Sequence, residues 1–255
     1  MLLVLDVGNT NTVIGVYEKN ELVNNWRVVT LPERTADEYG ILIRNLYYSS
    51  RINTDKISNV IVSCVVPPML GIIDELCWKY FDITPIYVEP GIKTGMSIIY
   101  DNPKEVGADR IVNAVAAYHK IGKALIVVDF GTATTFDCVD ENGDYIGGVI
   151  SPGLTTSSEA LFLKASKLPK VELIKPNSVI GKNTIHSMQS GIIFGYVDMV
   201  DGIVKRISKQ MNATPYVIAT GGLAEIIADI SMTIDEVDDF LTLKGLKIIY
   251  DLNQQ

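Results

Sequence analysis

The sequence predicts an α/β protein made of two similar domains, each with a mixed β-sheet flanked by helices. The first observation behind this prediction is an internal repeat: LLVLDVGNTNT, from Leu2 to Thr12, has a counterpart about half a chain later in LIVVDFGTATT, from Leu125 to Thr135. The second is an alternation of short β-branched runs with segments of helical periodicity, which is typical of sheets covered by helices.

Each copy of the repeat has the pattern of a buried strand that enters a tight turn. The alignment pairs Asp6 with Asp129, Gly8 with Gly131 and Thr12 with Thr135. Glycine removes the Cβ that would keep a ligand from the backbone, so that N–H groups and Asn or Thr side chains can bind phosphate oxygens. A carboxylate at the strand end can hold a metal ion, directly or through water. One such turn could be an ordinary β-turn, but two with similar hairpins after them indicate a duplicated phosphate-binding unit.

The chain of 255 residues could form one large domain or two of about 120 residues each. The repeat favours two, residues 1–118 with the first phosphate-binding turn and residues 119–255 with the second. We expect the two turns to face a common ligand. Whether the last helix packs back on the N-terminal domain is left open.

Composition excludes several classes of protein. A hydrophobic content of 47% with 20% charged residues is ordinary for a globular protein. The net charge of −8 and the lack of a basic run argue against nucleic-acid binding. No apolar stretch is long enough to predict a membrane span, and no secretory signal is evident. Cys64, Cys77 and Cys138 lack the spacing of a zinc site, so we expect free thiols in a reducing cytoplasm.

The first half continues with a capped helix and further alternating elements. Thr35 and Glu38 form a capping-box pattern at a helix start. The expected elements are a helix over 35–50, a strand over 58–66, a helix from the Pro67-Pro68 pair to about residue 80, a short strand over 84–89 and a loop-rich segment over 93–109. Asp109 then begins another helix. It suits both an N-cap and a catalytic base, because a helix N-terminus favours the ionised carboxylate.

The second half is expected to repeat the alternation. The expected elements are a helix from residue 154 to about 167, a loop over 170–184, a long helix over 187–211 with a broad apolar stripe, a strand over 216–220 and a helix after the Gly221-Gly222 turn. Residues 235–252 are expected to be helical.

Several blocks of the sequence resemble one known family. They are YDNPKEVGADRIVNAVAAYHK from Tyr100, DVGNTNT from Asp6, TADEY from Thr35, VVDFGTATTFD from Val127, GGVISPGL from Gly147, GKNT with QSG between Gly181 and Gly191, and IATGGLA from Ile218. In this order, over nearly the full length, they resemble type III pantothenate kinase, a family of the acetate and sugar kinase, Hsp70 and actin superfamily. The resemblance implies two actin-like (ribonuclease H-like) domains with an ATP cleft between them.

The resemblance also implies an activity and a set of site residues. The activity is ATP-dependent phosphorylation of pantothenate to 4'-phosphopantothenate, the first step of coenzyme A biosynthesis, with Asp109 as the base. The implied ATP-binding residues are Asp6, Val7, Gly8, Asn9, Thr10, Asn11, Thr12, Val13 and Thr132. The implied substrate-binding residues are Tyr100, Gly107, Ala108, Asp109, Arg110 and Thr184. The implied cations are Mg²⁺ with ATP, held by Asp6 directly or through water, and K⁺ or NH₄⁺, held by Asp129.

Other readings stay open. Arg110 is equally suited to a surface or interface ion pair. The family implies a homodimer in the cytoplasm, and the long helix from Ser187 is the candidate contact, although core packing explains its apolar stripe equally well. Two other functions compete with the kinase: a non-catalytic regulatory relative of the family, and an actin- or Hsp70-like ATPase.

Overall fold

A computed structural model describes residues 1–254, which form two compact units. The first unit comprises residues 1–96 and 101–116 together with the C-terminal residues from 241, and the second comprises residues 97–100 and 117–240. The helix that begins at Ala108 therefore contributes to both units, and the last helix of the chain belongs to the first.

The first unit is built on a five-stranded mixed sheet in the order β3-β2-β1-β4-β5. Its strands are β1 (Leu2–Val7), β2 (Asn11–Glu18), β3 (Glu21–Val29), β4 (Asn59–Cys64) and β5 (Ile86–Tyr87). The central strand β1 pairs antiparallel with β2 and parallel with β4. Its side chains alternate between two apolar clusters, which explains why the run is apolar at nearly every position.

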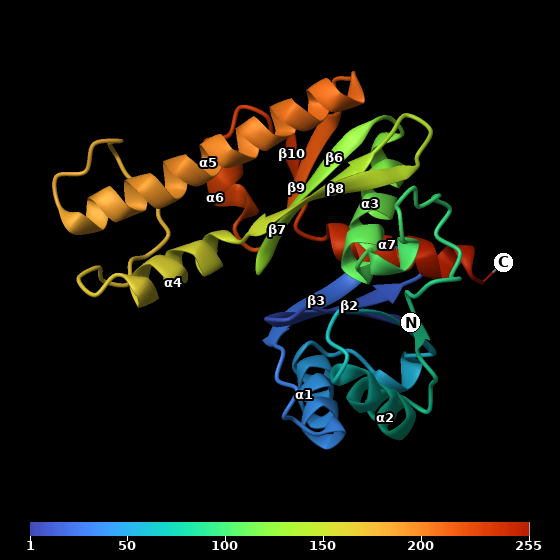
Figure 1. Cartoon of the computed structure of the whole chain (residues 1–255). Coiled ribbons are helices and arrows are strands. Elements are labelled where there is room, and N and C mark those ends of the chain that lie inside the picture. Colours follow the sequence, from blue (N-terminus) through green and yellow to red (C-terminus); the bar gives the residue numbers. More distant parts are fainter. Residues whose placement is uncertain (255) are drawn as a thin grey trace. The chain divides into compact units, whose positions relative to one another are not determined.

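Helices cover both faces of the first sheet (Figure 1). The helices of this unit are α1 (Ala36–Ser49), α2 (Met69–Phe81), the first part of α3 (Ala108–Ile121) and α7 (Leu241–Leu252), with short 3₁₀ turns at Thr54–Lys56 and Pro103–Glu105. α1 and α2 pack on the face that carries Leu3 and Leu5, whereas α3 and α7 pack on the face that carries Leu2 and Val4. The expected capping box starts α1, because the Glu38 amide donates to the Thr35 hydroxyl at 3.3 Å and the Thr35 amide donates to the Glu38 carboxylate at 2.8 Å.

The second unit repeats the same sheet. Its strands are β6 (Leu125–Phe130), β7 (Ala133–Val139), β8 (Tyr145–Pro152), β9 (Tyr216–Thr220) and β10 (Glu236–Val237), in the order β10-β9-β6-β7-β8. Its helices are the end of α3, α4 (Leu154–Lys164), α5 (Thr184–Met211) and α6 (Ala224–Ala228). Figure 1 shows α5 running along this sheet, where Ile193, Val197 and Val200 join one apolar cluster with Ile126 and Val128. The predicted fold class, two similar mixed sheets flanked by helices, is confirmed. Within residues 1–254 no helix is long and apolar enough to cross a membrane.

The two hairpins differ by one residue at the turn, so part of the sequence alignment is wrong. Val7 pairs with Thr12 in the first hairpin, whereas Phe130 pairs with Thr134 in the second. Thr12 is therefore equivalent to Thr134, and the predicted match of Thr12 with Thr135 fails. The reason is that the second turn spans two residues between the strands and the first spans three.

Two predicted helix boundaries also differ. α3 begins at Ala108, and the Ile111 amide donates to the Gly107 carbonyl at 3.2 Å. Asp109 therefore lies inside the first turn and is not the N-cap. α5 begins at Thr184, three residues before the expected start, because the Asn183 side chain caps it by accepting from the His186 amide at 2.9 Å.

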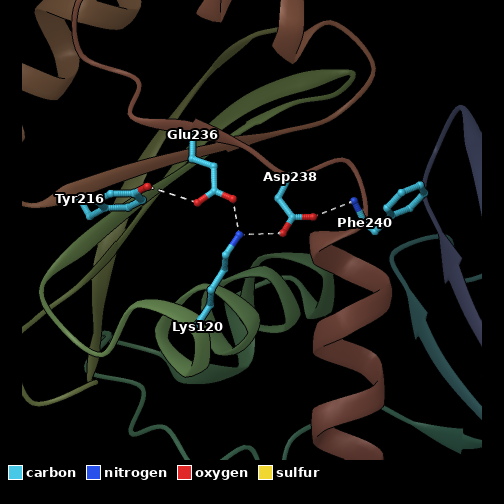
Figure 2. A network of polar contacts seen from close by, with 5 residues as sticks. All are labelled: Lys120, Tyr216, Glu236, Asp238 and Phe240. Carbon is cyan, nitrogen blue, oxygen red and sulfur yellow. Dashed lines mark hydrogen bonds and ion pairs between the residues drawn. The ribbon is translucent and has the colours of Figure 1, made fainter. Parts of the chain in front are cut away.

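Residues 235–240 are not helical, in contrast to the predicted helix over 235–252: Glu236–Val237 form β10, residues 239 and 240 form a turn, and α7 begins at Leu241. Backbone pairing holds them on β9: the Asp235 amide donates to the Val217 carbonyl at 2.9 Å, and the Asp235 carboxylate accepts from the Val217 amide at 2.7 Å. Figure 2 shows Lys120 of α3 between the carboxylates of Glu236 and Asp238, the latter at 3.4 Å. The hydrogen bond to Glu236 raises the pKa of Lys120, so its ammonium group stays charged. These contacts outweigh the helical preference of the segment.

A buried aspartate on α5 fixes the chain between α6 and β10. Asp201 is 3% exposed, and its carboxylate accepts from Ser231 Oγ at 2.5 Å, Thr233 Oγ1 at 2.7 Å and the Met232 amide at 3.1 Å. Burial by itself would raise the pKa of Asp201, but these three donors outweigh burial and lower it. The ionised form is therefore the form that stabilises this turn.

We expect Asp201→Asn to lower the free energy of unfolding at pH 7 by about 1–3 kcal/mol, the range for a hydrogen-bonded buried group. Because the folded-state pKa is lowered, the carboxylate contributes stability above its unfolded pKa and loses it as the pH falls through the folded value. Urea unfolding at pH 7 and at pH 3, below the unfolded pKa, should thus show a smaller acid-induced loss in the variant than in the wild type. Asp198→Asn, on the exposed side of the same helix, should change neither the free energy of unfolding at pH 7 nor its loss in acid. An equal pH dependence in wild type and Asp201→Asn would contradict this account.

Candidate active site

The first glycine turn, at Gly8, Asn9 and Thr10, follows the carboxyl end of β1. The Gly8 amide donates to the Asn11 carbonyl at 3.0 Å, and a Cβ at Gly8 would lie 3.2 Å from that oxygen. Asn9 and Thr10 are exposed at the tip. The turn is closed by its own backbone, and its tip is exposed.

Thr12, unlike Asn9 and Thr10, has a buried side chain. Its side chain is 5% exposed, and its hydroxyl shares a 2.9 Å hydrogen bond with that of Thr30 on the apolar α1–α2 side of the sheet. Asp6 lies on the other side, because strand side chains alternate and Asp6 shares the parity of Leu2 and Val4. The structure therefore separates the carboxylate of Asp6 from the hydroxyl of Thr12.

A buried serine lies beside Asp6. Ser63 is the register partner of Asp6 on β4, it is fully buried, and its hydroxyl has no hydrogen-bond partner among residues 1–254. A carboxylate with a neighbouring unsatisfied hydroxyl is an all-oxygen donor set, which is what Mg²⁺ and its bound waters require. Asp6 and Ser63 thus fit a magnesium site. The nearby Cys64 is no nucleophile, since burial raises the pKa of its thiol, its hydrogen bond to Val66 only partly opposes this, and Asp6 raises it further.

Asp109 lies on the same side of the first sheet as Asp6, in the first turn of α3. A Cβ at Gly107 would lie 2.6 Å from Asp109 Oδ1 and 3.7 Å from Val65 Cγ1. The Val65 amide in turn donates to the Val7 carbonyl at 3.1 Å, so this turn of α3 lies near the carboxyl ends of β1 and β4. The helix N-terminus favours the ionised carboxylate, and Asp109 Oδ1 also accepts from the Arg110 amide at 2.8 Å.

The other predicted residues of this loop have distinct environments. Arg110 is 8% exposed, which excludes a surface ion pair as the explanation of this residue. Gly107 and Ala108 are partly exposed beside Asp109. A side chain at residue 107 would collide with the Asp109 carboxylate, so this position requires glycine.

In the second unit, two glycines support the second turn. The Gly131 amide donates to the Ala133 carbonyl at 3.1 Å, and Thr132 is exposed at the tip. A Cβ at Gly153 would lie only 2.4 Å from the carbonyl oxygens of both Gly131 and Thr132. Thr156 of α4 donates its hydroxyl to the Thr132 carbonyl at 2.8 Å. The start of α4 therefore packs against the second turn and supports it.

Oxygen atoms gather around Gly221 at the end of β9. Its φ of +96° suits glycine, and a Cβ there would lie 2.7 Å from both Asp129 Oδ1 and the Phe130 carbonyl oxygen. The missing Cβ leaves a space bordered by a carboxylate and a carbonyl, the hard oxygen ligands that an alkali cation accepts. This arrangement fits the predicted cation ligand Asp129. No cluster of three or more His, Cys, Asp or Glu side chains that could hold a metal was found within residues 1–254.

The remaining two predicted substrate residues lie in the second unit. Tyr100 is 37% exposed, next to the start of β8, with its ring centroid 6.5 Å from that of Tyr145. Thr184 is the first residue of α5 and lines a cavity of about 850 Å³ between α4 and α5, together with Leu161 and Met188. Tyr100 and Thr184 thus project from different elements.

Sequence reasoning missed several supporting residues. Ser63 carried no motif, because a serine within an apolar strand signals burial and nothing about its register partner. Gly153 lies within the GGVISPGL block and Thr156 follows it, but their contact with the second turn depends on the path of β8 and α4. Gly221 had a partial signal, since it belongs to a Gly-Gly pair after a strand.

Comparison with known proteins identifies the family. The family model for type III pantothenate kinase matches residues 2–206. A type III pantothenate kinase of Syntrophus aciditrophicus is 58% identical over 253 residues, covering 99% of this chain and 100% of the relative. Among solved structures, a Campylobacter jejuni protein assigned to the Baf family of transcriptional activators has a TM-score of 0.63 at 18% identity, covering 99% of this chain and 98% of its own.

An inorganic polyphosphate/ATP-glucomannokinase of Arthrobacter sp. strain KM has the same fold at 12% identity, with a TM-score of 0.50 over 100% of this chain and 99% of its own. The fold is thus the one shared by sugar kinases and actin-like proteins, and at this low identity these structures speak only for the fold. The sequence relatives are more specific. With a family model over residues 2–206 and 58% identity across essentially the whole length, the chain belongs to the type III pantothenate kinase family.

Proposed function

We propose that this protein transfers the γ-phosphoryl group of ATP to the primary hydroxyl of pantothenate, the first step of coenzyme A biosynthesis. Family membership supports the substrates. The observation that carries the chemistry is the placement of Asp6 and Asp109 on the same side of the first sheet, near the carboxyl end of β1. A metal-binding carboxylate and a separate basic carboxylate are what phosphoryl transfer to an alcohol requires.

Each part of the reaction has residues suited to it. Backbone N–H groups and side chains of Gly8 to Asn11 bind phosphate oxygens at the first turn, and Thr132 binds them at the second. Asp6 and Ser63 would hold Mg²⁺, which neutralises phosphate charge when bound. Asp109 accepts the proton of the pantothenate hydroxyl while the oxygen of that hydroxyl bonds to the γ-phosphorus. The bond between the γ-phosphorus and the oxygen that leaves with ADP breaks.

A monovalent cation, K⁺ or NH₄⁺, is proposed at Asp129. The support is the set of oxygen atoms around Gly221, where the Asp129 carboxylate and the Phe130 carbonyl border the same space. A cation there would lie at the base of the second turn and add positive potential beside the phosphates.

Pantothenate is proposed to contact Tyr100, Gly107, Ala108, Arg110 and Thr184. A guanidinium group suits the pantothenate carboxylate, because it offers paired N–H donors in a fixed plane. Arg110 follows Asp109 directly, so a substrate held by one presents its hydroxyl near the other.

A homodimer is proposed through the cavity between α4 and α5. Gly191 and Gly195 leave room between the side chains on the facing surface of α5, because a Cβ at either would meet no atom within 4 Å. Leu161 on α4, which lines the cavity, is 39% exposed. An apolar cavity with exposed aliphatic rims fits a second copy of the same surface, as twofold symmetry requires. The three cysteines are free thiols, which supports a cytoplasmic location.

Two other functions would give different results in one assay of ADP release. A regulatory relative would release no ADP under any K⁺ or NH₄⁺ condition. An actin-like ATPase would release ADP without pantothenate. A pantothenate kinase should release ADP in equal amount to the 4'-phosphopantothenate formed, and only when pantothenate is present.

We expect Asp109→Asn to lower kcat by about a hundredfold or more, the low end of the contribution of a general base. ATP binding, measured by calorimetry, should change little because Asp109 acts on the acceptor. Asp55→Asn replaces an exposed aspartate in the first turn of another helix and serves as the matched control, with an expected kcat near that of the wild type. Near-normal turnover of Asp109→Asn would remove it from the role of base.

We expect Asp129→Ala to abolish most of the rate increase that K⁺ gives, because the carboxylate is the charged member of the proposed site. The measurement is the initial rate as a function of KCl at a constant ionic strength held with tetramethylammonium chloride. An identical KCl response in wild type and variant would place the cation elsewhere.

We expect Leu161→Arg to convert a dimer to a monomer, because a charge buried against the aliphatic lining of the cavity lacks a partner. Light scattering after size exclusion should show a halved mass. Ile41→Arg changes an exposed aliphatic residue on α1, 56% exposed, and should leave the mass unchanged. A wild type that is already monomeric at micromolar concentration would refute the dimer.

A further inference from the structure

Tyr145, the first residue of β8, has a fully buried side chain that is hydrogen-bonded to the fully buried side chain of Asp137. Its hydroxyl donates to Asp137 Oδ1 at 2.8 Å, and both residues have 0% exposure. The other carboxylate oxygen, Asp137 Oδ2, accepts from the Thr135 hydroxyl at 2.9 Å. A buried polar group is costly to leave unpaired, so these hydrogen bonds fix the orientation of the Tyr145 ring.

The backbone of the same tyrosine holds the segment that leads to Tyr100. The Tyr145 amide donates to the Ser97 carbonyl at 2.8 Å, and the Ile99 amide donates to the Tyr145 carbonyl at 2.8 Å. Ile98 and Tyr145 form a parallel bridge at the edge of the second sheet. An otherwise irregular loop is therefore attached to the sheet at one residue, immediately before Tyr100.

The Tyr100 ring is supported on two sides. Its centroid lies 6.5 Å from that of Tyr145 with the planes at 53°, the tilted arrangement that aromatic pairs prefer. Gly147 lies beside the ring as well, since a Cβ there would lie 3.9 Å from Tyr100 Cε2. At 37% exposure the ring keeps a free surface for a ligand while its other side is packed.

The same contacts extend toward the second turn. Thr135 is the cross-strand partner of Asp129, so the two side chains are neighbours on one face of the sheet. The chain of residues from Asp129 through Thr135, Asp137 and Tyr145 ends at Tyr100. It joins the proposed cation ligand to a proposed substrate contact within one unit.

We propose that Tyr145 and Asp137 are positioning residues that set the affinity for pantothenate by fixing the Tyr100 ring. The proposal rests on the proposed function, because it takes Tyr100 as a contact of pantothenate. Neither residue touches the reacting atoms in this scheme. Their loss therefore acts on pantothenate binding and leaves ATP binding unaffected.

The test is a kinetic comparison of Tyr145→Phe with the wild type. We expect KM for pantothenate to rise about five- to tenfold, the effect of losing one ordinary hydrogen bond, with KM for ATP changed less than about twofold. Tyr118→Phe is the matched control: its hydroxyl donates to the Glu141 carbonyl in the turn of the same β7–β8 hairpin, at 3.2 Å, and its loss should leave both constants unchanged. Equal rises in both KM values, or none, would overturn the proposal.

A double-mutant cycle separates positioning from general destabilisation. If Tyr145 acts through Tyr100, then adding Tyr145→Phe to Tyr100→Leu should raise KM for pantothenate by less than about twofold further. Additive effects would overturn the proposal. Should Tyr145→Phe fold poorly, Thr135→Val should raise the same KM in the same direction, and Thr135→Ser, which keeps the hydroxyl, should restore it.

Hydrogen exchange distinguishes failure of this inference from failure of the proposed function. Without any substrate, Tyr145→Phe should speed exchange of the Ile99 amide several-fold and leave exchange in β1 unchanged. A wild type without pantothenate-dependent ADP release would refute the proposed function. An active wild type whose Tyr145→Phe variant keeps both the slow exchange at Ile99 and the normal KM for pantothenate would refute the positioning role alone.

Discussion

The central strand of each sheet is hydrogen-bonded along both edges, and the rest of each unit depends on this constraint. β1 has β2 on one side and β4 on the other, and β6 has β7 and β9 in the same relation. A strand paired on both edges and covered on both faces has no freedom to shift, because any slip would bury polar groups and expose apolar ones. Asp6 and Asp129, near the ends of these strands, are held in fixed positions.

Because the strand ends are fixed, the glycine turns that follow them have a defined position and orientation. The backbone leaves the sheet at Gly8 or Gly131 with its orientation already determined, so its N–H groups are preorganised before a ligand arrives. Supporting contacts are close in both units: Val65 bonds to the end of β1, and Gly153 lies directly against the second turn. In the first unit, the start of α3, which contains Asp109, also lies near the carboxyl ends of β1 and β4.

Sequence patterns predicted elements well where local signals decide the structure. The strand at Tyr216–Thr220 and the capping box at Thr35 are as expected. Patterns failed where a distant partner decides. Residues 235–240 have helical composition, yet pairing with β9 and the charge of Lys120 keep them from forming a helix. Asp109 suited an N-cap, but the helix takes Gly107 in that place, where a Cβ would lie 2.6 Å from Asp109 Oδ1.

The site residues also divide into those with a local sequence signal and those that depend on a distant partner. The aspartates and glycines of the turns were evident from the repeat, whereas Ser63 became visible only through its register with Asp6. The buried pair of Asp137 and Tyr145 has no local signature, since an aspartate in a strand and a tyrosine after a turn are each unremarkable alone. Their relation depends on the alternation of β7 and on where β8 begins.

The one-residue difference between the two turns has a consequence for how the halves diverged. Loss of a single codon in one copy of a duplicated gene would shorten the turn yet leave strand polarity intact on both sides of it. Strand pairing therefore places equivalent positions opposite the two aspartates: an aliphatic group, Val13, in the first half and a hydroxyl, Thr135, in the second. The surroundings of the two carboxylates differ by a substitution within the strand and not by the length of the loop, so a chimera that exchanges only the loops would leave each aspartate beside its own neighbour.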